Sequence, residues 1–324
     1  IPSGNVVLSS RAPIGYFAVV KNDFTTNQGC KSVIFEKDQN ALFHYYNFLF
    51  NVQVFKEKGE GTTFAEISKK VIEKLKFTFP ISFAEQTKIA TILTTIDQAI
   101  EKTEQLIAKY ERIKTGLMQD LLTRGIDEHG NIRREETHEF KDSPLGRIPR
   151  EWEVKRMKNL LDVIDCKHVT PNYTQEGVPI IRPRNVTDEG IDFSDMAFVS
   201  YSDFEFLMEN HIPQKGDIIF TRNASFGNSS YLDYDFDVAI GQDMVIMTPK
   251  DNEVNSKFVF YQLNFSEFQN QVLKLSGGST FGRINLKVLR KLYVKSPPKN
   301  EQDKIDDTIT NISKNIENTE RSEL

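Results

Sequence analysis

The longest regular pattern in the chain is a row of apolar residues spaced three or four positions apart between residues 84 and 122. Ser82 and Glu85 stand just before it with the spacing of a capping box, which closes the first turn of a helix. The pattern predicts one continuous helix, about 58 Å long at 1.5 Å per residue. The row consists of Ile89, Ile92, Ile96, Ala99, Thr103, Leu106, Tyr110, Ile113 and Leu117. Such a stripe predicts a coiled-coil seam, which needs a partner helix.

A similar helix is predicted over residues 299–324, with Ile305, Ile312 and Ile316 on its seam. It is the available partner for the first helix. Short runs of β-branched and aromatic residues predict strands elsewhere, and two of these runs follow Gly4 and Gly216. Further strands are expected at residues 32–35, 77–79, 178–181, 245–247 and 292–294.

The chain also contains an internal repeat, which decides the architecture. Three blocks recur in the same order: residues 4–15 match 216–227, residues 63–75 match 280–292, and residues 85–104 match 301–320. The chain therefore consists of two copies of one unit, a strand-rich domain followed by a long helix. Residues 150–215 have no counterpart before the first block. The first copy is therefore expected to lack its beginning, about 70 residues by alignment of the copies.

The repeat and the helices predict five segments. They are the last part of a first strand-rich domain (1–80), a long helix (81–123), a polar connector (124–149), a complete second strand-rich domain (150–298) and the start of a second long helix (299–324). The expected fold class is α+β.

Composition limits the function. With 39% hydrophobic residues and no apolar run near 18 residues, the chain is typical of a soluble protein with no membrane span. Its two cysteines, Cys30 and Cys166, lie far apart, which favours a reducing cytoplasm over a disulfide framework. The net charge of −5 argues against nucleic acid as a partner, but many acidic residues gather in the predicted helices and connector and leave room for basic faces elsewhere.

Several motifs in this order resemble the specificity subunit of type I restriction-modification enzymes, over nearly the whole chain. They are Thr63-Phe64, Pro80, Glu85-Gln86-x-Lys88-Ile89, the helix end at residues 116–122, and Leu145-Gly146-Arg147-Ile148-Pro149-x-x-Trp152. In that family two target recognition domains each read one half of a split DNA site. Two long helices pair antiparallel, hold these domains apart and dock the methyltransferase subunits. The missing beginning of the first copy departs from the family pattern.

The resemblance implies partners and cofactors. The partners are double-stranded DNA, two methyltransferase subunits and the restriction or translocase subunits. S-adenosylmethionine, ATP and Mg²⁺ are expected on those subunits and not on this chain. The residues support the same role independently, because two similar domains on a stiff spacer suit a two-part target.

Base edges are best read by Arg, Lys, Asn and Gln on loops. Arg182, Arg184 and Asn185 follow a predicted strand and are the favoured readers; alternatively they form a solvated turn paired with Asp188 or Glu189. The remaining candidates are Arg222, Asn223 and Ser225 with Ser10 and Arg11 at the matching place, Gln242 with Gln28, and the glycine-rich loops holding Ser279, Thr280, Arg283, Thr62 and Thr63. An arginine in both copies suggests phosphate contact, with a structural ion pair as the alternative. The matched glutamines and the glycine loops could equally be features of the fold.

Enzymatic interpretations find little support. Ser296-Pro297-Pro298 is followed by Lys299, where an adenine methyltransferase needs an aromatic residue. The five histidines are scattered and predict no metal site. Two alternatives to a DNA-reading subunit stay open: a coiled-coil scaffold with degenerate domains, and the recognition part of a fused methyltransferase.

Overall fold

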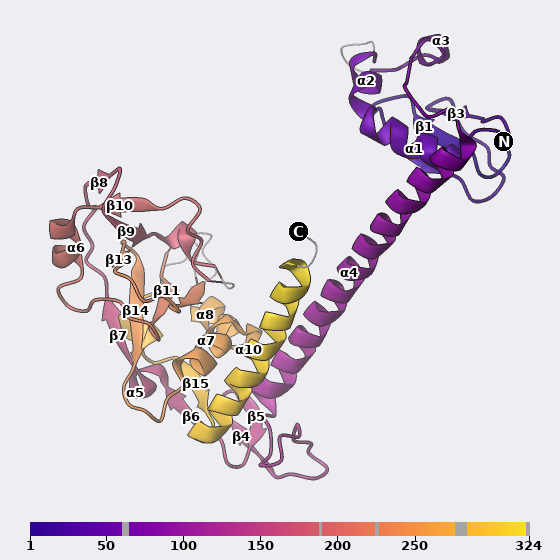
Figure 1. Ribbon diagram of the computed structural model, residues 1–324. Coiled ribbons are helices and arrows are strands. Elements are labelled where there is room, and N and C mark those ends of the chain that lie inside the picture. The colour runs from indigo at the N-terminus through magenta and orange to yellow at the C-terminus, as the bar shows by residue number, and fades with distance from the viewer. Residues whose placement is uncertain (60–64, 188–189, 224–226, 276–283, 322–324) are drawn as a thin grey trace. The chain divides into compact units, whose positions relative to one another are not determined.

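The computed structural model describes residues 1–59, 65–187, 190–223, 227–275 and 284–321 (Figure 1). The described chain divides into two compact units, residues 1–107 and 108–321, with the boundary inside the long helix. Unit 1 and unit 2 are used below for these two parts. The fold is mixed helix and sheet, as the sequence predicts.

Unit 1 is built on one small antiparallel sheet with the strand order β2-β1-β3. Its strands are β1 (Val6–Ser9), β2 (Phe17–Val19) and β3 (Cys30–Val33), and its short helices are α1 (Ala41–Phe50), α2 (Val52–Glu57) and α3 (Lys69–Ile72). Alternate residues of β1 turn inward, because successive side chains of a strand point to opposite faces. Val6 and Leu8 are therefore buried, and they meet Phe48 and Phe55 in the core.

Unit 2 carries two four-stranded sheets, ordered β12-β11-β14-β7 and β13-β9-β10-β8, and two strand pairs, β15-β6 and β4-β5. The strands are β4 (Phe140–Ser143), β5 (Gly146–Pro149), β6 (Glu153–Arg156), β7 (Leu161–Asp165), β8 (Tyr173–Thr174), β9 (Val178–Ile181), β10 (Ala197–Val199), β11 (Ile218–Thr221), β12 (Ser229–Tyr231), β13 (Ala239–Ile240), β14 (Met244–Pro249) and β15 (Tyr293–Ser296). The helices are α5 (Met157–Leu160), η1 (Pro183–Asn185), α6 (Tyr201–Leu207), α7 (Ser256–Asn264), α8 (Ser266–Leu275) and α9 (Leu286–Leu289).

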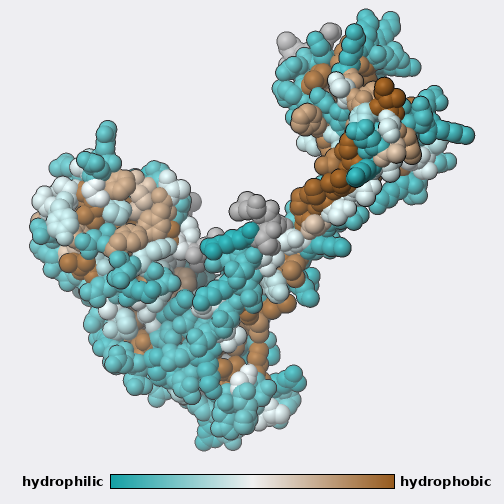
Figure 2. Space-filling view, in the orientation of Figure 1, coloured by the Kyte–Doolittle hydropathy of each residue, from teal (hydrophilic) through white to brown (hydrophobic). Residues whose placement is uncertain are grey.

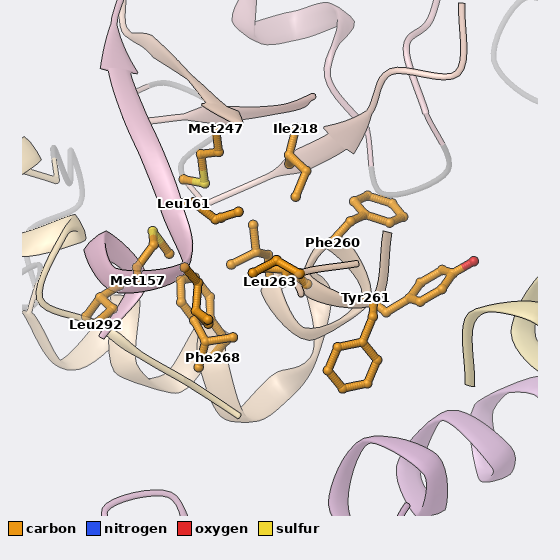
Figure 3. Close-up of a cluster of buried hydrophobic side chains, with 14 of the residues drawn as sticks. Met157, Leu161, Ile218, Met247, Phe260, Tyr261, Leu263, Phe268 and Leu292 are labelled. Carbon is orange, nitrogen blue, oxygen red and sulfur yellow. The ribbon is translucent and has the colours of Figure 1, made fainter. Parts of the chain in front are cut away.

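The first of these sheets separates two apolar cores. Ile218 and Phe220 of β11 belong to the core on the α7 and α8 side, whereas Ile219 between them belongs to the core shared with the second sheet. Figure 3 shows the first core, where Ile218, Met247 and Leu161 face Phe260, Leu263 and Phe268. Because β11 is buried on both faces, it is a run of apolar residues and not an alternation.

Two long helices complete the chain, α4 (Phe83–Thr123) and α10 (Lys299–Arg321). In unit 2 the last turns of α4 pack into the first core through Leu121 and Leu122, beside Ile305 and Ile309 of α10. The end of α4 thus meets the beginning of α10, and the two helices run antiparallel there (Figure 1). Buried Lys295 donates a hydrogen bond of 3.0 Å to the Leu122 carbonyl, one of the acceptors that a helix end leaves free. No described helix is both long enough and apolar enough to cross a membrane.

The seam residues differ in burial along α4. Ile92, Ile96, Leu106 and Ile113 are between 38% and 52% exposed, and an apolar stripe follows this helix in Figure 2. Of the remaining positions of the predicted row on α4, Ala99 is exposed, and Ile89, Thr103, Tyr110 and Leu117 are partly buried. On α10, Ile305 and Ile316 are buried and Ile312 is partly buried.

The repeat is confirmed by matching hydrogen bonds. In unit 1 the Gln86 side-chain oxygen accepts from the backbone N–H of Asn40 at 2.8 Å, and in unit 2 Gln302 accepts from Asn255 at 2.9 Å. Both asparagines cap the helix that follows, α1 in one copy and α7 in the other. The order β2-β1-β3 also recurs as β12-β11-β14.

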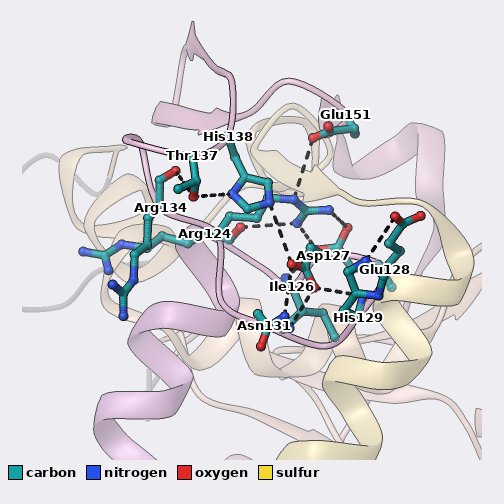
Figure 4. A network of polar contacts seen from close by, with 12 residues as sticks. Arg124, Ile126, Asp127, Glu128, His129, Asn131, Arg134, Thr137, His138 and Glu151 are labelled. Atoms are coloured by element: carbon teal, nitrogen blue, oxygen red, sulfur yellow. Dashed lines mark hydrogen bonds and ion pairs between the residues drawn. The ribbon is translucent and has the colours of Figure 1, made fainter.

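The connector predicted at residues 124–149 is held by buried polar contacts. Arg133 pairs through both terminal guanidinium nitrogens with Glu301, whose carboxylate also accepts from the Ile126 N–H and the Trp152 indole. Gly125 has a φ of +62°, and a Cβ there would collide with Glu301 and Trp152. Figure 4 shows the neighbouring turn, where the Asp127 side chain accepts from the His129 and Asn131 N–H groups.

One predicted strand is wrong. Residues 77–79 form no strand, although their counterpart in unit 2 is β15. The physical reason is that β15 pairs with β6, and no described residue of unit 1 takes the place of β6. The strand expected at residues 32–35 is β3, which ends two residues earlier, at Val33.

Candidate nucleic-acid interface

The favoured loops of unit 2 meet at one edge, beyond the ends of β9, β11 and β13. β13 runs parallel to β9 with Ile240 opposite Ile181, so both strands end at the same edge. The Gly241 N–H donates to the Ile181 carbonyl at 2.8 Å, which places Arg182 beside Gln242 along this edge. The Arg222 N–H donates to the Asp243 carbonyl at 2.7 Å, which brings in the end of β11. Loops distant in sequence are therefore held together by backbone hydrogen bonds.

Arg184 lies on η1, Arg182 is the residue just before it, and both approach Asp195. The Arg184 guanidinium is 2.6 Å from the Asp195 carboxylate, and Arg182 donates to the Asp195 backbone carbonyl at 2.6 Å. Arg184 remains 57% exposed at its side chain and is the more accessible of the two. The acidic partner is Asp195, and the two residues named as alternative partners, Asp188 and Glu189, lie outside the described residues.

Asn185 is buried and its amide is committed to the protein. Its nitrogen donates to the carbonyls of Asp192 and Asp195, and its oxygen accepts from the Arg182 N–H. These bonds shape the turn that carries Arg182 and Arg184. In this conformation Asn185 cannot present its amide to a base edge.

Arg222 is the most enclosed arginine of the edge, with 6% of its side chain exposed. It forms an ion pair with Asp165 at the end of β7 and donates from Nε to the Ile284 carbonyl at 3.1 Å. Because its donors point into the protein, Arg222 joins β7, β11 and the residues just before α9. This geometry supports the structural alternative over phosphate contact. Asn223 beside it donates to the Asp243 carboxylate at 3.4 Å.

Gln242 is half-buried at the turn before β14. Its side-chain nitrogen donates to the Thr170 hydroxyl at 2.6 Å. The next residue, Asp243, has a φ of +62°, a strained conformation for a residue with a side chain. The turn thus has a defined shape. This shape suits either recognition of a base by Gln242 or packing of the loop.

The matching loop of unit 1 is arranged differently. Arg11 pairs with Glu66 at 3.0 Å and stays 49% exposed. Ser10 is fully buried and accepts a hydrogen bond of 3.1 Å from Lys31, while Gln28 is exposed and its backbone carbonyl accepts from the same lysine. The remaining candidates, Thr62, Thr63, Ser225, Ser279, Thr280 and Arg283, lie outside the described residues.

The sequence did not single out the acidic partners Asp165 and Asp195 or the hydrogen-bond acceptor Thr170. A repeat comparison cannot find them, because residues 150–215 have no counterpart in the first copy. One feature of the sequence could have indicated Asp165, because it is an acidic residue at the end of an apolar run.

Two observations on the described residues concern metal binding and thiol chemistry. No three His, Cys, Asp or Glu side chains among them lie close enough together to hold a metal ion. Cys166 is buried, and burial raises the pKa of its thiol, which disfavours the reactive thiolate.

Solved structures share this fold. The S subunit of a type I restriction-modification system from M. genitalium aligns with 99% of the chain and 79% of its own, with a TM-score of 0.66 at 16% identity. The HsdS subunit from Thermoanaerobacter tengcongensis aligns with 100% of the chain and 76% of its own, with a TM-score of 0.52 at 16% identity.

Sequence relatives occur in Methanocaldococcus jannaschii. The type I restriction enzyme MjaVIII specificity subunit is 25% identical over 287 residues, which is 87% of the chain and 65% of that relative. The MjaIX specificity subunit is 29% identical over 206 residues, 61% of the chain and 46% of that relative. The chain thus spans less than two thirds of the length of these two relatives.

The family profile described as type I restriction modification DNA specificity domain matches residues 1–112 and 149–324. The two matched stretches fall on the two copies of the repeat, and together they include both long helices apart from the last turns of α4. The chain therefore belongs to the family of type I restriction modification DNA specificity domains.

Proposed function

We propose that this chain reads a bipartite DNA site within a type I restriction-modification complex. The observation that carries the proposal is the edge of unit 2, where the loops that follow β9 and β13 bring Arg182, Arg184 and Gln242 together. Arginine and glutamine present the paired donors and acceptors that guanine and adenine recognise in the major groove. Unit 1, built on the same strand order, is the second reader in this proposal.

The long helices have two further roles in this proposal. They set the separation of the two half-sites, and they dock two methyltransferase subunits and the restriction or translocase subunits. S-adenosylmethionine, ATP and Mg²⁺ belong to those subunits. The exposed apolar residues of α4 support a role in assembly, because contiguous exposed apolar surface marks protein contacts. DNA as the target and two free cysteines fit a cytoplasmic protein.

A DNA-binding assay tests the proposal. The full chain is mixed with its methyltransferase partner and labelled duplexes, and the shift is followed as salt is raised. We expect binding that weakens with salt, because phosphate contacts release counterions, and that prefers some sequences over others. Binding without any sequence preference would agree with contacts to phosphates but would refute sequence-specific recognition of bases.

A scaffold with degenerate domains is the second candidate. The pairing of Arg184 with Asp195 and of Arg222 with Asp165 favours it, since each arginine already has an acidic partner. The same assay separates the two functions: a scaffold forms the complex with the methyltransferase but confers no DNA binding on it.

A further inference from the structure

Two stretches of unit 2 contain basic residues and no acidic ones, although the chain has a net charge of −5. The first is 154–161, from β6 through α5, and the second is 284–300, from α9 through β15. Five of their residues are called the basic face below: Arg156, Lys158, Lys287, Arg290 and Lys291. Four of them are exposed, and Arg290 is partly buried. The chain is therefore acidic on average but basic in this part of unit 2.

The two stretches lie side by side in the fold. β6 pairs with β15 along its whole length, and the Lys158 N–H donates to the Arg290 carbonyl at 3.2 Å. Lys287, Arg290 and Lys291 are three and four positions apart along α9 and the turn after it, which places them on one side. Segments far apart in the sequence therefore bring their basic residues together.

The basic face has little acidic surface to neutralise it. None of its five residues forms an ion pair with a described acidic side chain. Lys158 and Arg290 line an open groove of about 630 Å³ along the outer edge of β7, where Arg290 donates to the Val163 carbonyl at 2.6 Å. Asp162 and Asp165 line it too, but each already forms an ion pair with another cation. The groove therefore has an excess of positive charge.

This groove begins at the candidate nucleic-acid interface of unit 2. The Ile284 N–H, just before α9, donates to the carbonyl of Arg222 at 3.0 Å, and Arg222 follows β11 at that interface. Asp165, at the end of β7, pairs with Arg222 and also lines the groove. The basic face therefore continues from the interface along β7 and α9.

The repeat places lysines at the matching helix of unit 1. In the sequence, Lys70 and Lys74 match Lys287 and Lys291, and all four are exposed. α3 is also held as α9 is, by a hydrogen bond of 2.8 Å from the Ile67 N–H to the loop that follows β1. Exposed side chains usually contribute little to stability. Lysines at these positions in both copies therefore favour a shared role in binding.

At the interface itself the arginines supply little unpaired positive charge, because Arg184 pairs with Asp195 and Arg222 pairs with Asp165. Affinity for DNA nevertheless comes largely from cations that contact phosphates. We propose that the basic face binds the sugar-phosphate backbone of the duplex whose bases the interface reads. This inference rests on the proposed function for the choice of DNA as the partner. The basic face fixes the position of the duplex and carries no sequence information.

The test measures DNA binding over a range of salt concentrations, with the full chain and its methyltransferase partner. Lys158→Gln, Lys287→Gln and Lys291→Gln are made singly. For each lysine that contacts a phosphate, we expect the slope of log K against log salt to fall by about 0.9, and affinity at about 0.1 M salt to fall roughly five- to tenfold. The preference for one duplex sequence over another should stay unchanged. Lys287→Arg keeps the charge and should keep the slope.

Lys215→Gln is the matched control. Lys215 is an exposed lysine of the same unit that pairs with Asp233, and it lies before β11, at the end opposite to the interface. Its removal should leave the slope unchanged.

Three results would overturn the proposal. Unchanged slopes in all three glutamine variants would show that the basic face does not contact DNA. Unchanged slopes with weaker assembly with the methyltransferase would assign the basic face to a protein partner instead. No DNA binding by the unaltered complex would overturn this inference and the proposed function together, whereas salt-dependent binding without sequence preference would refute the proposed function alone.

Discussion

At the scale of single residues, the acidic partners and the burial around them distinguish arginines that stay accessible from arginines that are enclosed. Arg184 holds Asp195 from an exposed position, whereas Arg222 is enclosed and joins three elements. Two arginines that look alike in the sequence therefore have different expected roles. The sequence favoured Arg184 as a reader and left Arg222 open between phosphate contact and a structural ion pair, because its acidic partner Asp165 lies far away in the sequence.

Arg184→Ala should weaken binding by about 1 to 3 kcal/mol and relax the preference at one half-site only, because one base edge loses its paired donors. Competition binding with duplexes altered in either half-site measures this. Arg147→Ala is the control, since Arg147 is also an exposed, ion-paired arginine but lies on β5. An equal loss on all sequences would reassign Arg184 to phosphate contact.

Arg222→Met should lower the stability of unit 2 before it affects specificity. The change leaves Asp165 without its cation and the Ile284 carbonyl without a donor, and losing a donor to a buried acceptor costs about 1 to 3 kcal/mol. Thermal unfolding measures the loss. An unchanged midpoint together with weaker DNA binding would show that Arg222 acts on DNA directly.

At the scale of elements, the sequence predicted what local patterns determine. The apolar row predicted α4 to within one residue at each end, and the run Val178–Ile181 is β9. The strand at residues 77–79 was wrong because a strand also needs a neighbour, and its neighbour is not a local property of the sequence. The connector shows the same limit, because its polar sequence gives no sign that Arg133 and Glu301 form a buried pair.

Glu301→Gln should destabilise unit 2 by roughly 3 kcal/mol, because it removes one partner of a buried ion pair that also holds the Trp152 indole. The free energy of unfolding from denaturant titration measures this. The repeat provides a matched control, since Glu85→Gln makes the same change at the exposed counterpart and should have no measurable effect on stability. Equal effects on the free energy of unfolding at the two sites would show that burial of Glu301 by the connector does not contribute to stability.

At the scale of the whole molecule, the internal repeat is the feature from which the proposed function follows. Two copies of one strand order, each followed by a long helix, suit a protein that contacts two half-sites. The repeat was visible in the sequence because glycines, Gln86 and Gln302 serve the same structural purpose in both copies. The repeat does not identify the residues that would read bases, because each copy is expected to read a different half-site with its own side chains.

Selection of binding sites from random duplex DNA tests the central claim most directly. The full chain is used with its methyltransferase partner, and the bound sequences are aligned. Two conserved blocks separated by a gap of fixed length are expected, with Arg184→Ala relaxing one block and leaving the other unchanged. A single block, a gap of variable length, or no enrichment over random sequence would contradict the account.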